Sequence, residues 1–293
     1  MNIPLYIQYD SEQITDGFGA QGLRIVGLYT VAKAFKLKYL HQEISEITDR
    51  LELTGPGGDE PKYRQVLEEM NQFLAFTSHS DLNNLELSRT VSIHNLGLRA
   101  LFKYIFLSFL RPNQYLLKVC LPFGIVDRFP FLYRFSRKDI QRVISERKRE
   151  SKKIGNVVHI RGSEHSPDKT RPQLGPSYFE KLIFSGRYSC FPGRSWIIHT
   201  DFYSTDFSQK IKTERANKFV SLFERFENDE MIEVHHYASI SIVFSDMVHA
   251  DLLIMSRSAL SYLAGIFCEG VVVYPSNHGH AKLPRWKMES VEE

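Results

Sequence analysis

The sequence predicts an α/β protein made of two Rossmann-like, doubly wound halves. Short apolar runs alternate with longer amphipathic runs, and this rhythm is most regular in the second half of the chain. Strands separated by helices of about 10–15 residues indicate βαβ units and a parallel sheet. The length of 293 residues suits one large domain or two ordinary ones, and the rhythm favours two. We expect halves over 1–140 and 150–275, with a tail over 276–293 that packs back or frays.

The first half has the weaker rhythm. Apolar and β-branched residues predict strands over 3–9, 37–41 and 90–94, and the helical period predicts helices over 23–35, 63–76 and 96–110. The stretch 52–61 contains three glycines and two prolines, so we expect a loop there. Arg111-Pro112 ends the last of these helices because the residue before proline is disfavoured in a helix.

The segment 136–153 changes character, with eight basic and three acidic side chains and little apolar content. We favour a solvated helix at the junction of the two halves. The alternative is a basic collar that faces an anionic ligand.

In the second half, each of the first four predicted strands is followed by a helix. Strands are predicted over 155–160, 195–200, 231–235, 251–255 and 270–274, and helices over 177–184, 211–226, 239–248 and 258–267. Right-handed crossovers would place the functional loops of such a unit at the carboxyl ends of its strands.

Composition narrows the classes of function. Hydrophobic residues make up 43% of the chain and charged residues 24%, which excludes disorder as its main state. The net charge of +3 is too small to predict binding to nucleic acid, although it leaves room for one local basic pocket. The three cysteines form no zinc-type pair and suit a reducing compartment.

A glycine-rich segment, DGFGAQ, follows the first predicted strand. Gly17, Gly19 and Gly22 match the letters G-x-G-x-x-G, and glycines followed by a helix N-terminus allow close approach of an anion. The acidic residue that dinucleotide binding needs about 20 positions on is offered only by Glu43. Taken alone, the segment therefore favours a plain tight turn over nucleotide binding.

A second segment, VVHIRG, ends a predicted strand. Alternation puts His159 and Arg161 on one face, with Arg161 at the carboxyl end. An arginine there can fork onto a phosphate, and Gly162 leaves room for a diphosphate. A surface ion pair explains Arg161 equally well.

A third segment, DLLIMSRS, runs from a buried strand into a serine cluster. Ser256 and Ser258 are both candidate N-caps of the following helix, and the same groups suit a phosphate. Capping needs only one serine, so a second serine with Arg257 between them favours an anion site.

The order of these motifs, G-x-G-x-Q, then H-x-R-G, then D-x-x-x-x-S-x-S, resembles the fucosyltransferase superfamily. The resemblance implies the two-domain GT-B fold, with an acceptor-side first half and a donor-binding second half across a cleft. It implies that Arg161 and His159 belong to the diphosphate motif and that Ser256–Ser258 line the phosphate, with Asp251 near the base or as a structural support. The residues Gly17, Phe18, Gly19 and Gln21 would form a loop that faces the donor. The pattern also looks like glycosyltransferases of large algal (chlorovirus-type) viruses, some of which use UDP-xylose.

One departure from the superfamily bears on the donor. The second basic residue that often follows the motif arginine is absent, since Gly162-Ser163-Glu164 stand there. Arg257, Arg171 or Lys169 could replace it. The donor therefore stays open between UDP-xylose and GDP-fucose.

These motifs predict an inverting glycosyltransferase that needs no metal, because the chain has no D-x-D motif. Asp16 is the favoured base, although an aspartate that only shapes the loop is as plausible, and His41 and Glu164 follow. Asp201 and Tyr203 are placed to recognise the base or the ribose of the donor nucleotide, unless they belong to an exposed loop. The neighbours His235 and His236 point to opposite faces of a strand, which argues against a shared metal ion.

Rival functions remain. The first is a non-catalytic module that binds a nucleotide or glycan on the same fold. A kinase-like enzyme is disfavoured because no P-loop motif is present. We expect a nucleotide sugar as co-substrate, no other cofactor, an oligosaccharide or glycoprotein acceptor, no nucleic acid and no membrane span. With no signal sequence visible, the expected location is the cytoplasm, or a host cytoplasm if the protein is viral.

Overall fold

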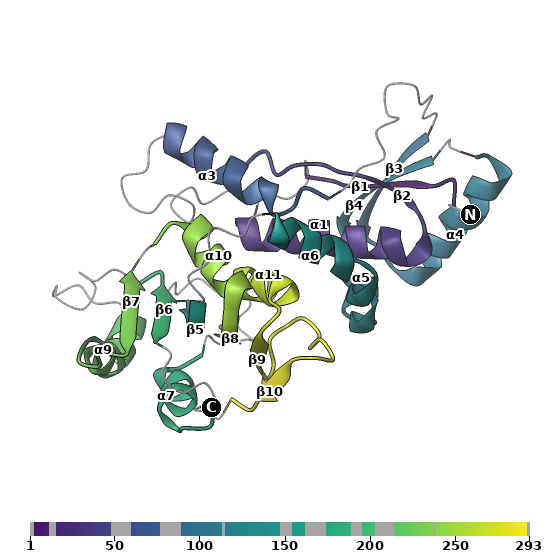
Figure 1. Cartoon of the computed structure of the whole chain (residues 1–293). Helices are drawn as coiled ribbons and strands as arrows, with labels where there is room; N and C mark the ends of the chain where they lie inside the picture. The colour runs from purple at the N-terminus through teal and green to yellow at the C-terminus, as the bar shows by residue number, and fades with distance from the viewer. Residues whose placement is uncertain are drawn as a thin grey trace. The chain divides into compact units, whose positions relative to one another are not determined.

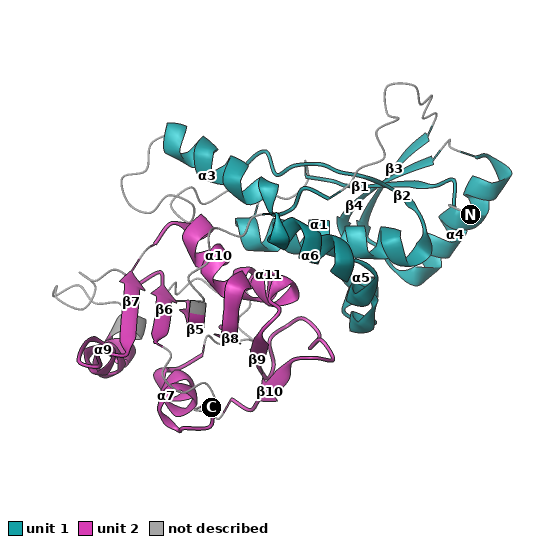
Figure 2. Cartoon of the chain, viewed as in Figure 1, with its two compact units in different colours: residues 1–149 teal, residues 150–293 magenta. Residues whose placement is uncertain are grey.

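The structure is a computed structural model that describes residues 3–11, 16–47, 60–76, 89–112, 115–146, 154–161, 174–188, 195–202, 214–236 and 238–291. The chain divides into two compact units, Met1–Arg149 (unit 1) and Glu150–Glu293 (unit 2), coloured separately in Figure 2. Each unit is described below by itself.

Unit 1 contains a parallel sheet in the order β2-β1-β4-β3 (Figure 1). Its strands are β1 (Tyr6–Tyr9), β2 (Lys38–Leu40), β3 (Arg89–Asn95) and β4 (Tyr115–Leu121). Its helices are α1 (Phe18–Phe35), α3 (Glu60–Gln72), α4 (Leu98–Leu110), α5 (Phe123–Val126), the 3-10 helix η2 (Pro130–Phe135) and α6 (Arg137–Ser145). The unit is α/β, as the sequence predicts.

Unit 2 contains a parallel sheet in the order β10-β9-β8-β5-β6-β7. Its strands are β5 (Ile154–Ile160), β6 (Trp196–Thr200), β7 (Ile232–His236), β8 (Ala250–Ile254), β9 (Val271–Pro275) and β10 (Lys287–Glu289). Numbered within the unit, this order is 3-2-1-4-5-6, read from β7 to β10, which is that of dinucleotide-binding folds. The predicted Rossmann-like architecture of this half is therefore confirmed.

Helices cover both faces of the unit 2 sheet. They are α7 (Pro176–Phe184), α9 (Glu214–Glu227), α10 (Ile240–His249) and α11 (Ala259–Phe267). Val158, Ile160 and Ile198 point into one apolar core with Phe179 of α7 and Phe223 of α9. The intervening strand positions turn to the other face, where they meet α10 and α11. The opposite face carries aliphatic side chains as well, such as Val157 and Leu253, together with the histidines described below.

The structure corrects several details of the sequence analysis. The apolar run 115–121 was not recognised as a strand, yet β4 is central and nearly all buried, so it lacks the alternation typical of a half-exposed strand. The tail contributes β10, a short strand held by its pairing to β9. Helix α1 begins at Phe18, so the predicted loop over 16–22 is mostly the first turns of a helix.

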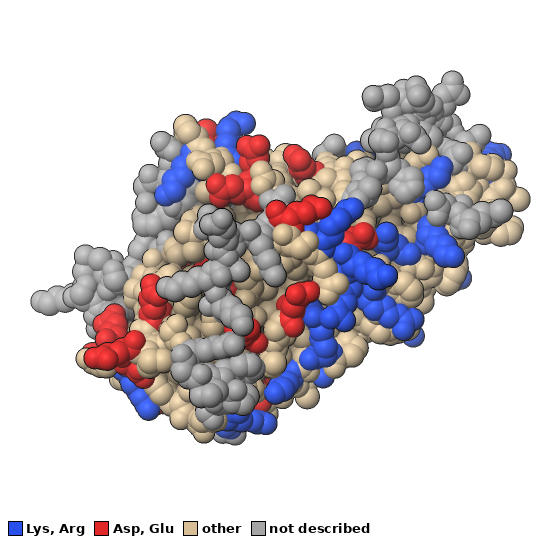
Figure 3. Space-filling view, viewed as in Figure 1, with Lys and Arg blue, Asp and Glu red and all other residues tan. Residues whose placement is uncertain are grey.

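The described part of the basic segment, residues 136–146, contains helix α6, and a helix is what the sequence favours. Its Ile140, Val143 and Ile144 are buried, and Asp139 accepts a 2.7 Å hydrogen bond from the Tyr29 hydroxyl of α1. Lysine and arginine side chains gather over the α5–α6 stretch on the face shown in Figure 3. The exposed basic residues there are Arg128, Arg134, Arg137, Lys138 and Arg142. Helix α6 is therefore amphipathic, with a solvated basic face.

Candidate functional site

The site in unit 2 lies where the chain changes direction across the sheet. From β5 the chain moves to β6 on one side, whereas β8 pairs with β5 on the other side. Ligands of open α/β sheets bind outside the carboxyl ends of the strands at such a switch point. Arg161 directly follows β5, and Ser256 lies two residues beyond the end of β8. The two motifs, far apart in sequence, therefore meet at the carboxyl ends of two neighbouring central strands.

A buried hydrogen-bond network joins these two strands. His159 Nδ1 lies 3.0 Å from Ser256 Oγ and 2.5 Å from Ser261 Oγ, and the two serine oxygens are 3.0 Å apart. All three side chains are buried, with exposed fractions of 7%, 1% and 0%. Burial lowers the pKa of His159 to about 3, and the nearby Arg161 and His199 add to this effect. A neutral imidazole thus fixes the loop after β8 against β5.

The two serines of the S-R-S segment have different roles. Ser258 is the N-cap of α11, and its Oγ accepts a 3.2 Å hydrogen bond from the Leu260 amide. Ser256 does not cap the helix, because its hydroxyl is engaged by His159. Of the two predicted N-cap residues, only Ser258 caps α11. The first amides of α11 therefore follow a loop that the hydrogen bond between His159 and Ser256 holds in place.

Neighbouring residues complete this end of the sheet. Arg257 donates a 3.1 Å hydrogen bond from Nη2 to the Ser276 carbonyl oxygen, just beyond β9. Asp201 directly follows β6, on the other side of β5. Three polar residues thus follow the carboxyl ends of three adjacent strands: Arg161 after β5, Asp201 after β6 and Arg257 after β8.

Asp251 is not at this end of the sheet. It is the second residue of β8 and lies about 16 Å along the strand from Ser256, at roughly 3.3 Å per residue. Asp251 therefore lies apart from Arg161 and Ser256, and its expected role, near the base or as a structural support, stays a prediction. The predicted residues Gly162 and Tyr203, and the candidates Glu164, Lys169 and Arg171, lie outside the described residues.

The predicted loop residues of unit 1 are built into its core. Phe18 and Gln21 are 0% and 1% exposed, and Gly19 is buried in α1 behind Gly17. Gln21 Nε2 donates 2.8 Å hydrogen bonds to the carbonyl oxygens of Asp16 and Glu46. Gln21 therefore anchors two chain segments, which is a structural role that the sequence analysis did not foresee.

The two candidate bases have defined partners. Asp16 forms an ion pair with Arg24, a buried residue of α1 that the sequence analysis missed because it stands within an apolar run. His41 directly follows β2, and its Nδ1 lies 3.2 Å from the Tyr39 hydroxyl. Burial lowers the pKa of His41, which favours its neutral form.

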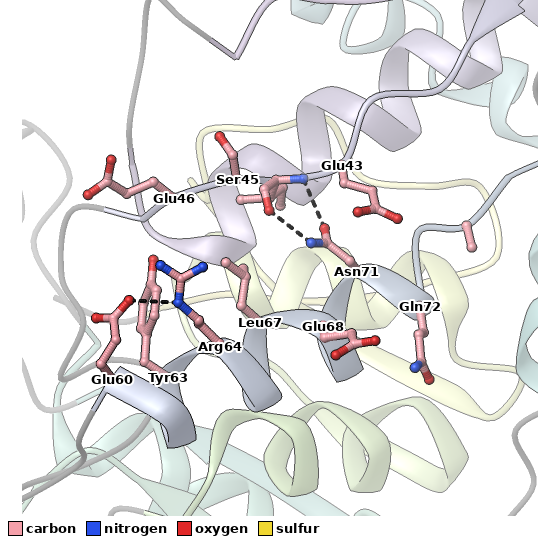
Figure 4. Close-up of a pocket in the computed structure, with 12 residues that line it drawn as sticks. Glu43, Ser45, Glu46, Glu60, Tyr63, Arg64, Leu67, Glu68, Asn71 and Gln72 are labelled. Atoms are coloured by element: carbon pink, nitrogen blue, oxygen red, sulfur yellow. Dashed lines mark hydrogen bonds and ion pairs between the residues drawn. The ribbon is translucent and has the colours of Figure 1, made fainter.

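Unit 1 also contains a hollow of about 680 Å³ between α3 and the segment 43–46 (Figure 4). Its lining includes the carboxylates Glu43, Glu46, Glu60 and Glu68. Asn71 closes one wall, because its side chain donates to the Ile44 carbonyl at 2.8 Å and accepts from the Ile44 amide at 2.9 Å. Glu43, which the glycine-rich pattern offers as the acidic residue for dinucleotide binding, thus lines a hollow that the sequence does not predict.

We expect Asn71→Ala to destabilise unit 1 by about 1–2 kcal/mol, because both buried backbone groups of Ile44 lose their partner. The measurement is the free energy of unfolding together with hydrogen exchange of the Ile44 amide. Gln72→Ala, at the neighbouring exposed position of α3, is the matched control. Equal exchange of Ile44 in Asn71→Ala and the wild type would contradict the assigned role.

No family model matches the chain, and no curated protein matches it. Among solved structures, E. coli heptosyltransferase WaaC with ADP is 12% identical with a TM-score of 0.45, covering 98% of this chain and 92% of that chain. POFUT1 in complex with GDP is 13% identical with a TM-score of 0.45, and both chains are covered fully, 100% each. At these identities and scores the likeness identifies no activity for this chain. None of the described helices is long and apolar enough to span a membrane.

Proposed function

We propose that the chain is a glycosyltransferase of the GT-B kind that moves a sugar from a nucleotide-diphosphate donor to a hydroxyl of a glycan. The observation that carries this proposal is the hydrogen bond between His159 and Ser256, which joins the H-x-R and S-x-S motifs at the switch point of unit 2. Two parallel α/β units in one chain suit a GT-B enzyme.

In this proposal, unit 2 binds the donor. Arg161 would form paired, charge-assisted hydrogen bonds to the diphosphate, and the first amides of α11 would donate to the same phosphates. Both interactions strengthen as negative charge develops on the leaving diphosphate, which makes them catalytic and not merely binding interactions. Arg257 and Asp201 are proposed donor contacts from the neighbouring strand ends.

Unit 1 is proposed to bind the acceptor and to supply the base. A base that takes the proton of the acceptor hydroxyl on the side opposite the leaving group gives inversion. Asp16 is the first candidate and His41 the second, and the neutral imidazole favoured by burial suits a base. Charge stabilisation by Arg161 and α11 is proposed to replace a metal ion. UDP-xylose and GDP-fucose are the two donors that the resemblance implies.

A thermal-shift screen tests this function. A ligand that binds only the folded state raises its stability by about 2.7 kcal/mol at a concentration of 100 Kd. We expect a nucleoside diphosphate, added at millimolar concentration, to raise the melting temperature. A larger shift with UDP than with GDP would favour the xylose donor, and the reverse order the fucose donor. Absence of any shift with every nucleoside diphosphate would contradict the proposal.

A non-catalytic binding module is the second candidate. It is favoured by the ion pair between Asp16 and the buried Arg24, because this contact gives the first candidate base a structural role within unit 1. The two candidate functions, the glycosyltransferase and the binding module, are distinguished by incubating the chain with a nucleotide sugar and a mixture of acceptors. Release of the nucleoside diphosphate from its sugar is the measurement. A donor that shifts the melting temperature but is never turned over would support the module.

A further inference from the structure

Three adjacent strands of unit 2 carry histidines at the same level. His159 of β5 pairs in register with His199 of β6, and His199 pairs with His235 of β7. Residues at matching positions of neighbouring strands point to the same face, so all three side chains turn towards the α10–α11 face. His159 is engaged by the serines, which leaves His199 and His235 as a pair beside α10.

Asp246 of α10 joins this pair. His199 Nε2 lies 2.9 Å from Asp246 Oδ2, and the His199 and His235 rings are 5.0 Å apart at 78°. One ligand atom from each of the three residues lies within 4.8 Å of the others. The exposed side-chain fractions are 0% for His199, 17% for Asp246 and 28% for His235, so the group is buried at one end and open at the other.

A hydrogen bond between His199 and Asp246 explains only part of this arrangement. It does not use His235, whose Nε2 lies 2.7 Å from Oε1 of the exposed Glu233 on the same strand. It also leaves His199 Nδ1 buried with no hydrogen-bond partner among the residues that the structure describes. By contrast, two imidazoles and one carboxylate whose ligand atoms lie within 4.8 Å of one another are the ligand types that a zinc-type ion prefers.

We propose that His199, His235 and Asp246 bind a divalent transition-metal ion of the zinc class. Metal–ligand distances of about 2.0 Å at tetrahedral angles require ligand atoms about 3.3 Å apart, so rotations of the partly exposed His235 and Asp246 side chains close the site. The imidazoles disfavour Mg²⁺ and Ca²⁺, which prefer oxygen ligands. With three protein ligands, the fourth position is taken by water.

The ion would fasten β6, β7 and α10 to one another. The ligands are not among the proposed diphosphate contacts, since the histidine row stands two residues, or about 7 Å along the strands, before Arg161 and Asp201. A structural ion is therefore compatible with sugar transfer that needs no metal. His236 belongs to the other face, where its Nδ1 lies 3.1 Å from the Phe202 carbonyl oxygen. The partner of His235 is thus His199 across the sheet and not its neighbour in sequence.

Zinc titration of the whole chain, stripped with a chelator and then freed of it, tests this site. We expect one zinc ion per chain by calorimetry and elemental analysis, and a higher melting temperature with zinc. His235→Ala and Asp246→Asn should each weaken zinc binding at least about ten-fold, since even the outer-shell partners of a metal contribute that much. With Co²⁺ in place of zinc, the wild type should show the visible absorption of a four-coordinate ion.

His94→Ala is the matched control, because His94 is an exposed histidine on β3 of unit 1. It should bind zinc as the wild type does. His235 is partly exposed, so His235→Ala is expected to fold, and unchanged tryptophan fluorescence checks this. Wild-type protein without stoichiometric zinc binding would overturn the proposal, as would ligand variants that bind zinc as tightly as His94→Ala. Neither result bears on nucleotide binding, which the thermal-shift screen measures separately.

Discussion

Arg161→Ala is expected to lower sugar transfer by about 10²–10³-fold, because a preorganised donor of hydrogen bonds to the leaving group typically contributes this much. Arg161 directly follows β5 at the switch point, where a phosphate would meet both its guanidinium and the first amides of α11. The loss should appear in kcat as well as in kcat/KM, because the interaction strengthens as the diphosphate leaves. Turnover of UDP- and GDP-sugars by the purified variant is the measurement.

Two further variants separate charge from geometry. Arg161→Lys keeps the positive charge but loses the planar fork, so we expect activity between those of the wild type and Arg161→Ala. Arg225→Ala removes a half-exposed arginine of α9 that pairs with Glu180, and it should leave turnover unchanged. If Arg161→Ala transfers sugar as fast as Arg225→Ala does, Arg161 forms an ordinary surface ion pair and the proposed donor site is wrong.

The parts of the fold that depend on local pattern could be predicted. The strands and helices of unit 2 follow from hydrophobic periodicity, and the positions of Arg161 and Ser258 follow from the strand and helix ends. Pattern alone did not find β4, because a strand buried on both faces shows no alternation. The sequence pattern also groups Asp251 with Ser256 and Ser258, although Asp251 lies near the amino-terminal end of β8 and the serines follow its carboxyl end.

The parts of the site that depend on tertiary contacts could not be predicted. Nothing in the letters S-R-S shows that Ser256 bonds to a histidine 97 positions away while Ser258 caps the helix. Likewise, the partner of Asp16 is a buried arginine on α1, and Gln21 holds the segment at Glu46. In the sequence His235 stands beside His236, whereas the register of the sheet brings it to His199. Register and helix docking decide these contacts, and neither can be inferred from a single sequence.

His159 is expected to make unit 2 less stable in acid. Burial holds its folded-state pKa at about 3, whereas an unfolded histidine has a pKa of about 6.5. Below pH 6.5 the unfolded state therefore binds more protons than the folded state, so stability falls as the pH falls towards 3. The slope is about 1.4 kcal/mol per pH unit, which gives a loss of about 2 kcal/mol between pH 7.5 and pH 5.

The protein offers a selective probe for this measurement. Its two tryptophans, Trp196 and Trp286, both belong to unit 2, so denaturant unfolding followed by tryptophan fluorescence reports that unit. In His159→Gln the loss of stability between pH 7.5 and pH 5 should be smaller by about 2 kcal/mol, whatever the variant's stability at pH 7.5. His94→Gln on unit 1 should keep the wild-type slope. If His159→Gln also keeps it, His159 titrates alike in the folded and unfolded states, and the closed network with Ser256 and Ser261 does not persist in solution.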